Sequence, residues 1–110
     1  MREPKAIELR SGEILQHEIK GDYWEKALLG YSQKRGYIWL TNERIHIEAG
    51  FVTVVDIDLK DIVALNKCNI SLFIPTGIDV VTQNKKTYRL SVLKREEHFN
   101  KLESLMNALK

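Results

Sequence analysis

Residues 36–49 read GYIWLTNERIHIEA, and this stretch decides the fold. Apolar and polar side chains alternate along residues 44–49, which is the period of a strand with one buried and one wet face. The side chains expected to face the core are Ile45, Ile47 and Ala49. Those expected to face water are Arg44, His46 and Glu48. Residues 37–41 precede Asn42, which tolerates the positive φ of a tight turn, so the stretch predicts a β-hairpin.

Further strands follow at short spacing. Residues 53–59 alternate in the same way, and residues 62–66 predict the next strand after a turn. Residues 77–82 and 87–92 predict a second hairpin. The loop between these strands, residues 68–76, contains a proline, which cannot donate to a central ladder. The inward side chains expected from these strands are Val55, Ile57, Leu59, Ile78, Val80, Tyr88, Leu90 and Val92.

The two ends of the chain have different patterns. We interpret residues 1–12 as an N-terminal extension and residues 13–110 as one domain. Residues 12–29 fit a strand about as well as a helix, and we interpret the region before Gly36 as two short strands. Residues 95–109 carry an apolar stripe at helical spacing, which predicts an amphipathic helix packed on the sheet. The stripe consists of Phe99, Leu102, Leu105, Met106 and Leu109.

Composition limits the class of protein. The chain has 110 residues, 44% of them hydrophobic and 29% charged, which is ordinary for one globular domain. The net charge of +2 is too small to steer the whole molecule to nucleic acid. Cys68 is the single cysteine, so no intrachain disulfide can form and a reducing compartment is expected. Without a signal-peptide pattern or a long uncharged apolar run, we expect a cytoplasmic protein.

Four short motifs resemble those of GRAM and bacterial pleckstrin-homology-like domains. They are GYIWLTNERI at 36–45, LKDI at 59–62, GIDVVT at 77–82 and KTYRL at 86–90. The resemblance implies a mostly β fold, a partly open antiparallel barrel of about seven strands closed by one C-terminal amphipathic helix. It also implies binding of lipid headgroups, membranes or proteins, with no catalysis and no cofactor, and frequent homo-oligomers. Because an early cluster of lysine and arginine is missing, we do not expect phosphoinositide specificity.

The residues that could carry other chemistry are scattered. No catalytic signature surrounds Cys68, and the three histidines have no zinc spacing. Asp56 and Asp58 share one strand face, where a cation site is conceivable but the wet side of a strand is the more common reading. The run RGYIWL at 35–40 partly resembles a basic and aromatic RNA-binding run, so a single-stranded nucleic-acid-binding module is the alternative function. Tyr37 and Trp39 are more simply packing aromatics under the C-terminal helix.

In a simple meander, alternate turns lie at the same end of the barrel. We therefore expect the turns at 33–36 and 49–52 and the loop at 68–76 to share one end. Basic residues beside apolar tips suit contact with an anionic membrane surface or a protein partner. The residues expected to make this contact are Lys34, Arg35, Phe51, Lys67, Leu72, Phe73 and Ile74. The alternative is that Phe51 and Phe73 fold back and plug the barrel.

These patterns together predict a non-catalytic adaptor domain that binds a membrane surface, a lipid headgroup or a protein. We expect it in the cytoplasm, peripheral on the inner face of the membrane, and self-associating through strand edges or the helix flank.

Overall fold

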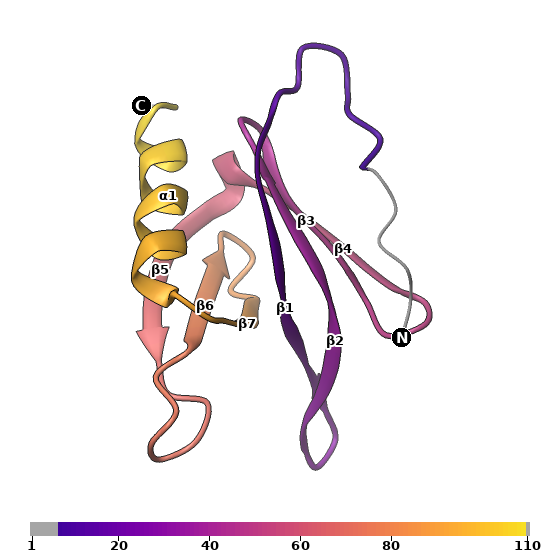
Figure 1. Ribbon diagram of the computed structural model, residues 1–110, viewed down its shortest axis with the longest axis vertical. Helices are drawn as coiled ribbons and strands as arrows, with labels where there is room; N and C mark the ends of the chain where they lie inside the picture. Colours follow the sequence, from indigo (N-terminus) through magenta and orange to yellow (C-terminus); the bar gives the residue numbers. More distant parts are fainter. Residues whose placement is uncertain (1–6, 110) are drawn as a thin grey trace.

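The computed structural model describes residues 7–109 (Figure 1). The strands are β1 (Leu15–Ala27), β2 (Gly30–Thr41), β3 (Arg44–Ala49), β4 (Thr53–Asp58), β5 (Ile62–Cys68), β6 (Gly77–Thr82) and β7 (Thr87–Val92). A 3₁₀ turn, η1 (Leu59–Asp61), joins β4 to β5, and the helix α1 (Arg95–Asn107) follows β7.

The described strands form one antiparallel sheet in the order β4-β3-β2-β1-β7-β6-β5. Figure 1 shows the sheet curling into a half-barrel, with α1 standing along one side. The helix packs against β6, β7 and η1. This confirms the predicted fold class, a mostly β, partly open barrel closed by one C-terminal helix.

Both predicted hairpins are confirmed. In the first, β2 pairs with β3 so that Ile38 faces Ile47 and Leu40 faces Ile45. In the second, β6 pairs with β7. Their inward side chains form most of one continuous core, whose buried members are Ile19, Tyr23, Ile38, Leu40, Ile45, Ile47, Ala49, Ile57, Leu59, Ile62, Ile78, Val80, Leu90, Val92, Phe99 and Leu102.

The region before Gly36 differs from its prediction. Two short strands were expected, but β1 spans 13 residues and β2 spans 12, and the turn between them is at residues 28–29. Gly21 and Gly36 lie directly opposite each other in this ribbon. A Cβ on Gly36 would overlap the carbonyl oxygen of Glu48, and one on Gly21 would press on Val92. The paired glycines therefore let the long ribbon pass close to β3 and β7.

The C-terminal helix is shorter than its apolar stripe. Phe99 and Leu102 are buried, and Leu105 and Met106 are partly buried against the core. Leu109 lies beyond the last helical residue and is 52% exposed, so its predicted place in the packed stripe is wrong. The rest of the stripe provides the contact that docks α1.

Polar side chains expected to face water are buried on the outer face of β3. Arg44 is 7% exposed and His46 is 8% exposed, and Glu48 is half-buried. Arg44 donates from Nε and Nη2 to the carboxylate of Glu13, at 2.8 and 3.1 Å, and from Nη1 to Asp56 at 2.8 Å. The prediction that these side chains are solvated is wrong, because the segment before β1 brings Glu13 over this face.

Three further interactions complete this polar cluster. His46 places Nδ1 2.6 Å from Asp56 Oδ1 and Nε2 3.0 Å from Glu48 Oε2. Thr41 donates its hydroxyl proton to Glu13 at 2.6 Å. Burial alone would raise the pKa of Glu13, but hydrogen bonds from Arg44, Thr41 and the Arg10 N–H outweigh it and lower the pKa to about 2. We call Glu13, Thr41, Arg44, His46, Glu48 and Asp56 the outer polar cluster.

The aromatic residues of β2 also lie on this outer face. The ring centroid of Trp39 is 5.5 Å from that of His46 and 6.1 Å from that of Tyr37. Trp39 is 1% exposed. Because the helix packs on the opposite side of the sheet, the expectation that Tyr37 and Trp39 lie under it is wrong.

Candidate interaction site

The turn between β1 and β2, the turn between β3 and β4 and the loop between β5 and β6 lie at one end of the half-barrel. This follows from the antiparallel order, and Figure 1 shows all three in the lower part of the molecule. Each carries a pair of apolar residues at its tip, and all six side chains are at least 84% exposed. These residues are Leu28, Leu29, Phe51, Val52, Leu72 and Phe73. We call them the apolar tips, and this part of the molecule the loop end.

The β1–β2 tip was missed by sequence reasoning, which put the turn at residues 33–36. Those residues instead belong to the interior of β2, and the true tip is Leu28-Leu29, with both side chains 98% exposed. Gly30 follows with a φ of 132°, a conformation that favours glycine. The sequence Leu28-Leu29-Gly30 could therefore have predicted this turn. It was missed because two adjacent leucines are more typical of a core than of a turn.

The ribbon that carries this tip projects beyond the rest of the sheet. β1 pairs with β7 only over residues 21–24, and β2 pairs with β3 only over residues 36–40. Two contacts brace the ribbon against β7. Trp24 donates from Nε1 to Ser91 at 3.0 Å, and the Arg89 guanidinium lies 4.7 Å from the Tyr31 ring centre. The tip is therefore held out on an ordered arm.

The β3–β4 and β5–β6 tips also point away from the core. Phe51 is 87% exposed and Phe73 is 89% exposed, so the alternative in which they plug the barrel is wrong. The β3–β4 connection is too short to fold back, since it has only Gly50, Phe51 and Val52, with Gly50 at a φ of 60°. The β5–β6 loop is closed on itself by the Ile70 N–H, which donates to the Ile74 carbonyl at 2.9 Å.

Not all the predicted cations are available at this end. Lys34 donates to Glu25 at 3.0 Å and to the Thr53 hydroxyl at 2.9 Å. Lys67 is bonded to Glu96 and sits over the Phe99 ring, 4.8 Å from its centre. Their positive charges are therefore partly compensated.

Arg35 is the predicted cation for which the described residues provide no ion pair. It is exposed, and within residues 7–109 it has no acidic partner at ion-pair distance. Lys26 on β1, two residues before Leu28, is exposed as well and was not predicted. Lys20 is also exposed, but it lies opposite Tyr37 in the middle of the ribbon. The loop end thus carries basic side chains near the apolar tips. Of the predicted cations, however, Lys34 and Lys67 are ion-paired.

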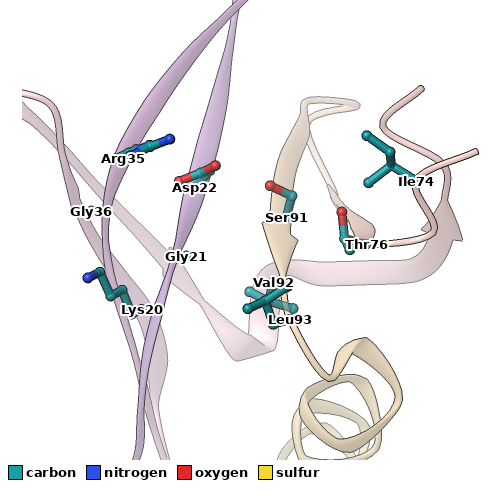
Figure 2. Close-up of a pocket in the computed structure, with 10 residues that line it drawn as sticks. All are labelled: Lys20, Gly21, Asp22, Arg35, Gly36, Ile74, Thr76, Ser91, Val92 and Leu93. Carbon is teal, nitrogen blue, oxygen red and sulfur yellow. The ribbon is translucent and has the colours of Figure 1, made fainter.

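Arg35 and Ile74 are brought together at a shallow hollow of about 490 Å³ (Figure 2). Figure 2 shows residues of β1 and β2 on one side, Ile74 and Thr76 of the β5–β6 loop on the other, and Ser91 between them. Lys34, Arg35 and Phe51 line a second hollow beside the β3–β4 turn. Four of the predicted contact residues, Lys34, Arg35, Phe51 and Ile74, therefore line two hollows that share Arg35. Lys67, Leu72 and Phe73 line neither of these hollows.

The nucleophiles and metal-ligating side chains have structural partners. Burial raises the pKa of the Cys68 thiol, and nearby Asp79 raises it further, so the thiolate form is disfavoured. Among the described residues, no group of three or more His, Cys, Asp or Glu side chains is placed to hold a metal ion. Asp58 forms an ion pair with Arg10 at 3.0 Å, and Asp56 accepts a hydrogen bond from Arg44 within the outer polar cluster.

Comparisons with known proteins add information on the fold. No family model matches the chain, and no curated protein matches it. It is similar to a solved structure of the C-terminal domain of an unknown protein from Leishmania infantum, with a TM-score of 0.76 and 22% identity over 91% of this chain and 88% of that one. At this identity the likeness shows a shared fold and no more. In residues 7–109, no helix has the length and apolar character needed to cross a bilayer.

Proposed function

We propose that this chain is a non-catalytic, cytoplasmic adaptor domain of the GRAM or bacterial pleckstrin-homology-like kind, whose loop end inserts shallowly into an anionic membrane surface. The observation that carries the proposal is the set of three apolar tips, each at least 84% exposed, at one end of the half-barrel. Exposed apolar residues that cluster in this way mark an interaction surface.

A membrane suits these tips better than a rigid protein surface does. The tips are separate projections and not one flat patch, since they belong to three different connections. A protein partner would need three matching cavities at fixed spacing, whereas fluid lipid accommodates separate projections without shape complementarity. Burying each large apolar side chain contributes about 1.5–3 kcal/mol. Four of the tip side chains, Leu28, Leu29, Phe51 and Phe73, would therefore supply about 6–12 kcal/mol before entropy losses.

The charges of the loop end have a supporting role. Arg35 and Lys26 are exposed, and each cation near an anionic surface contributes about 1 kcal/mol. Asp22 and Glu25 on the same arm offset part of this. We therefore expect added salt to weaken binding without abolishing it. The predicted self-association would present several loop ends at once and strengthen attachment.

The nucleic-acid alternative is not supported by a comparable surface. Its basis was the aromatic run around Tyr37 and Trp39, but Trp39 is 1% exposed and its ring lies against that of His46 at an angle of 40°. A buried indole cannot stack on a base.

The test is co-sedimentation with phosphatidylcholine vesicles, with and without phosphatidylserine. Wild type should pellet with the anionic vesicles, and both Phe73→Ser and a Leu28→Ser, Leu29→Ser pair should remain in the supernatant. Leu109→Ser is the matched control, because Leu109 is also an exposed leucine but lines a hollow with Arg10 and Lys60 away from the tips. Wild type that stays in the supernatant, or tip variants that bind as well as Leu109→Ser, would rule out the membrane proposal.

A further inference from the structure

The edge strand β4 has main-chain groups that are open to a partner. In the part of the chain that the structure describes, β4 forms one edge of the sheet. The Leu59 N–H donates to the Glu43 carbonyl at 2.9 Å, in register with the β3–β4 ladder. Because hydrogen-bonded pairs alternate along an antiparallel ladder, Val54 and Asp56 turn their N–H and C=O away from β3. Asp58 is the N-cap of η1, so its carbonyl is used by the first bond of that 3₁₀ turn.

A groove runs beside this edge. Its larger part, about 490 Å³, lies between β4 and the side chains of Tyr23, Glu25, Lys86 and Tyr88. A smaller part, about 300 Å³, continues past η1 to the β6–β7 turn. Both parts share Asp56 and Tyr88, so they meet alongside the middle of β4. The open side of the half-barrel is thus a channel, and one of its borders is the β4 edge with its outward N–H and C=O groups.

The two faces of this channel differ in chemistry. On the inner face, Val55 packs against the core, and Tyr23 and Tyr88 line the same hollow. On the outer face, the Asp56 and Asp58 side chains remain 39% and 33% exposed although they are ion-paired. The charged residues that line the groove are four acids, Glu25, Asp56, Asp58 and Asp61, and one base, Lys86. Glu25 is ion-paired with Lys34, so Asp61 is the acid of this groove that has no ion pair within residues 7–109.

We propose that the β4 edge binds an extended basic peptide segment of a partner protein as an additional strand. The outward main-chain groups of Val54 and Asp56 would hydrogen-bond the peptide backbone, as in other cases of strand addition. Alternate apolar side chains of the peptide lie against Tyr23 and Tyr88, and the intervening basic ones face the acids. This site is separate from the apolar tips and does not depend on membrane binding.

The test uses fluorescence polarisation with the full chain and no lipid. The probe is a labelled short peptide of alternating valine and lysine, and the comparison peptides replace lysine by glutamate or carry alternate N-methyl groups. We expect the valine–lysine peptide alone to bind. Val54→Pro removes one outward N–H and should weaken binding about tenfold, the loss expected for one hydrogen bond. Val54→Thr keeps that N–H and a β-branched side chain, and should bind as wild type does.

Folding of the proline variant is checked by circular dichroism, and we expect it to fold because proline is tolerated on edge strands. The Asp61 side chain accepts no hydrogen bond within residues 7–109, so Asp61→Asn provides an independent variant and should weaken binding of the lysine peptide. The proposal is overturned if the valine–lysine peptide does not bind, or if the glutamate or N-methyl peptides bind equally well. A dimer that Val54→Pro dissociates, together with no peptide binding, would assign the edge to a second copy instead.

Discussion

Arg44 and Leu29 stand at opposite extremes of exposure: the arginine is 7% exposed and the leucine is 98% exposed. The difference lies in their surroundings. Arg44 has carboxylates on two sides, from Glu13 and Asp56, and each of its nitrogens donates a hydrogen bond. Leu29 sits at the tip of an arm that extends past the rest of the sheet. A polar side chain is thus buried here where partners satisfy its charge and hydrogen bonds, and an apolar side chain without neighbours to pack against stays exposed.

The comparison also separates stability from binding. The residues of the outer polar cluster stabilise the fold as a group, because removing one of them leaves a buried charge without its partner, which is costly. The apolar tips make few internal contacts, so their loss should cost the fold little. Substitutions in the outer polar cluster should therefore lower stability, whereas substitutions in the apolar tips should lower binding and leave stability almost unchanged.

The largest effect is expected from Arg44→Met. It leaves the Glu13 carboxylate, whose side chain is 0% exposed, without its guanidinium, and should lower the free energy of unfolding by about 3–5 kcal/mol. Urea denaturation measures the loss. Arg10→Met is the control, because Arg10 makes an exposed pair with Asp58 and should cost about 1 kcal/mol or less. Equal losses in the two variants would mean that the outer polar cluster is not the critical region.

Acid should weaken the same cluster. The pKa of Glu13 is about 2 in the folded chain against 4.5 in the unfolded one, so the unfolded state binds the proton more readily. The stability from this group is complete above about pH 4.5 and is lost as the pH falls from there toward 2, amounting to about 3 kcal/mol. Urea titrations across this range should show a flatter pH dependence for Glu13→Gln than for wild type. Parallel curves would exclude this role of Glu13.

A smaller pH effect is expected where β1 meets α1. His17 Nε2 lies 3.0 Å from His98 Nδ1, and burial, with the charges of His17 and Lys94, lowers the pKa of His98 against an opposing effect of Glu97. Because the folded pKa is below the unfolded value of 6.5, stability falls as the pH drops below about 6.5. His98→Gln should remove this part of the dependence, measured as melting temperature against pH. An unchanged slope between neutral pH and the onset of Glu13 protonation would contradict the assignment.

The smallest effect on stability is expected at the tips. Because Leu28 and Leu29 are each 98% exposed, the Leu28→Ser, Leu29→Ser pair should change the free energy of unfolding by about 0.5 kcal/mol or less. Thermal denaturation checks this, and a loss of about 2 kcal/mol or more would show that the tip packs in solution. With vesicle binding measured on the same sample, the variant separates binding from folding.

The hairpins could be predicted from the sequence because their inward residues follow a strict period of two. The same period was misleading for Arg44 and His46. Alternation shows that the two faces of a strand differ, but not that one of them is wet. The partner that buries Arg44 is Glu13, 31 residues away and outside every periodic segment, so a local pattern could not reveal it.

The candidate site was predicted in part for a similar reason. The apolar loop residues Phe51, Leu72 and Phe73 were identified, since they interrupt polar connections. Leu28 and Leu29 were missed because apolar residues in an ambiguous segment read as core. Placing the first turn too late in the chain also put Lys34 in a loop, whereas it lies in β2 and pairs with Glu25.

The pairing of β1 with β7 has a consequence for synthesis on the ribosome. Trp24 and Ser91, which bond across this pair, are 67 residues apart. At about 5–20 residues per second, translation leaves Trp24 waiting roughly 3–13 s after its own synthesis before Ser91 is added. Through that interval the nascent chain presents an open β1 edge beside Ile19 and Tyr23, which later become buried. A holdase chaperone or slow downstream codons would therefore change the yield of this domain more than its final stability.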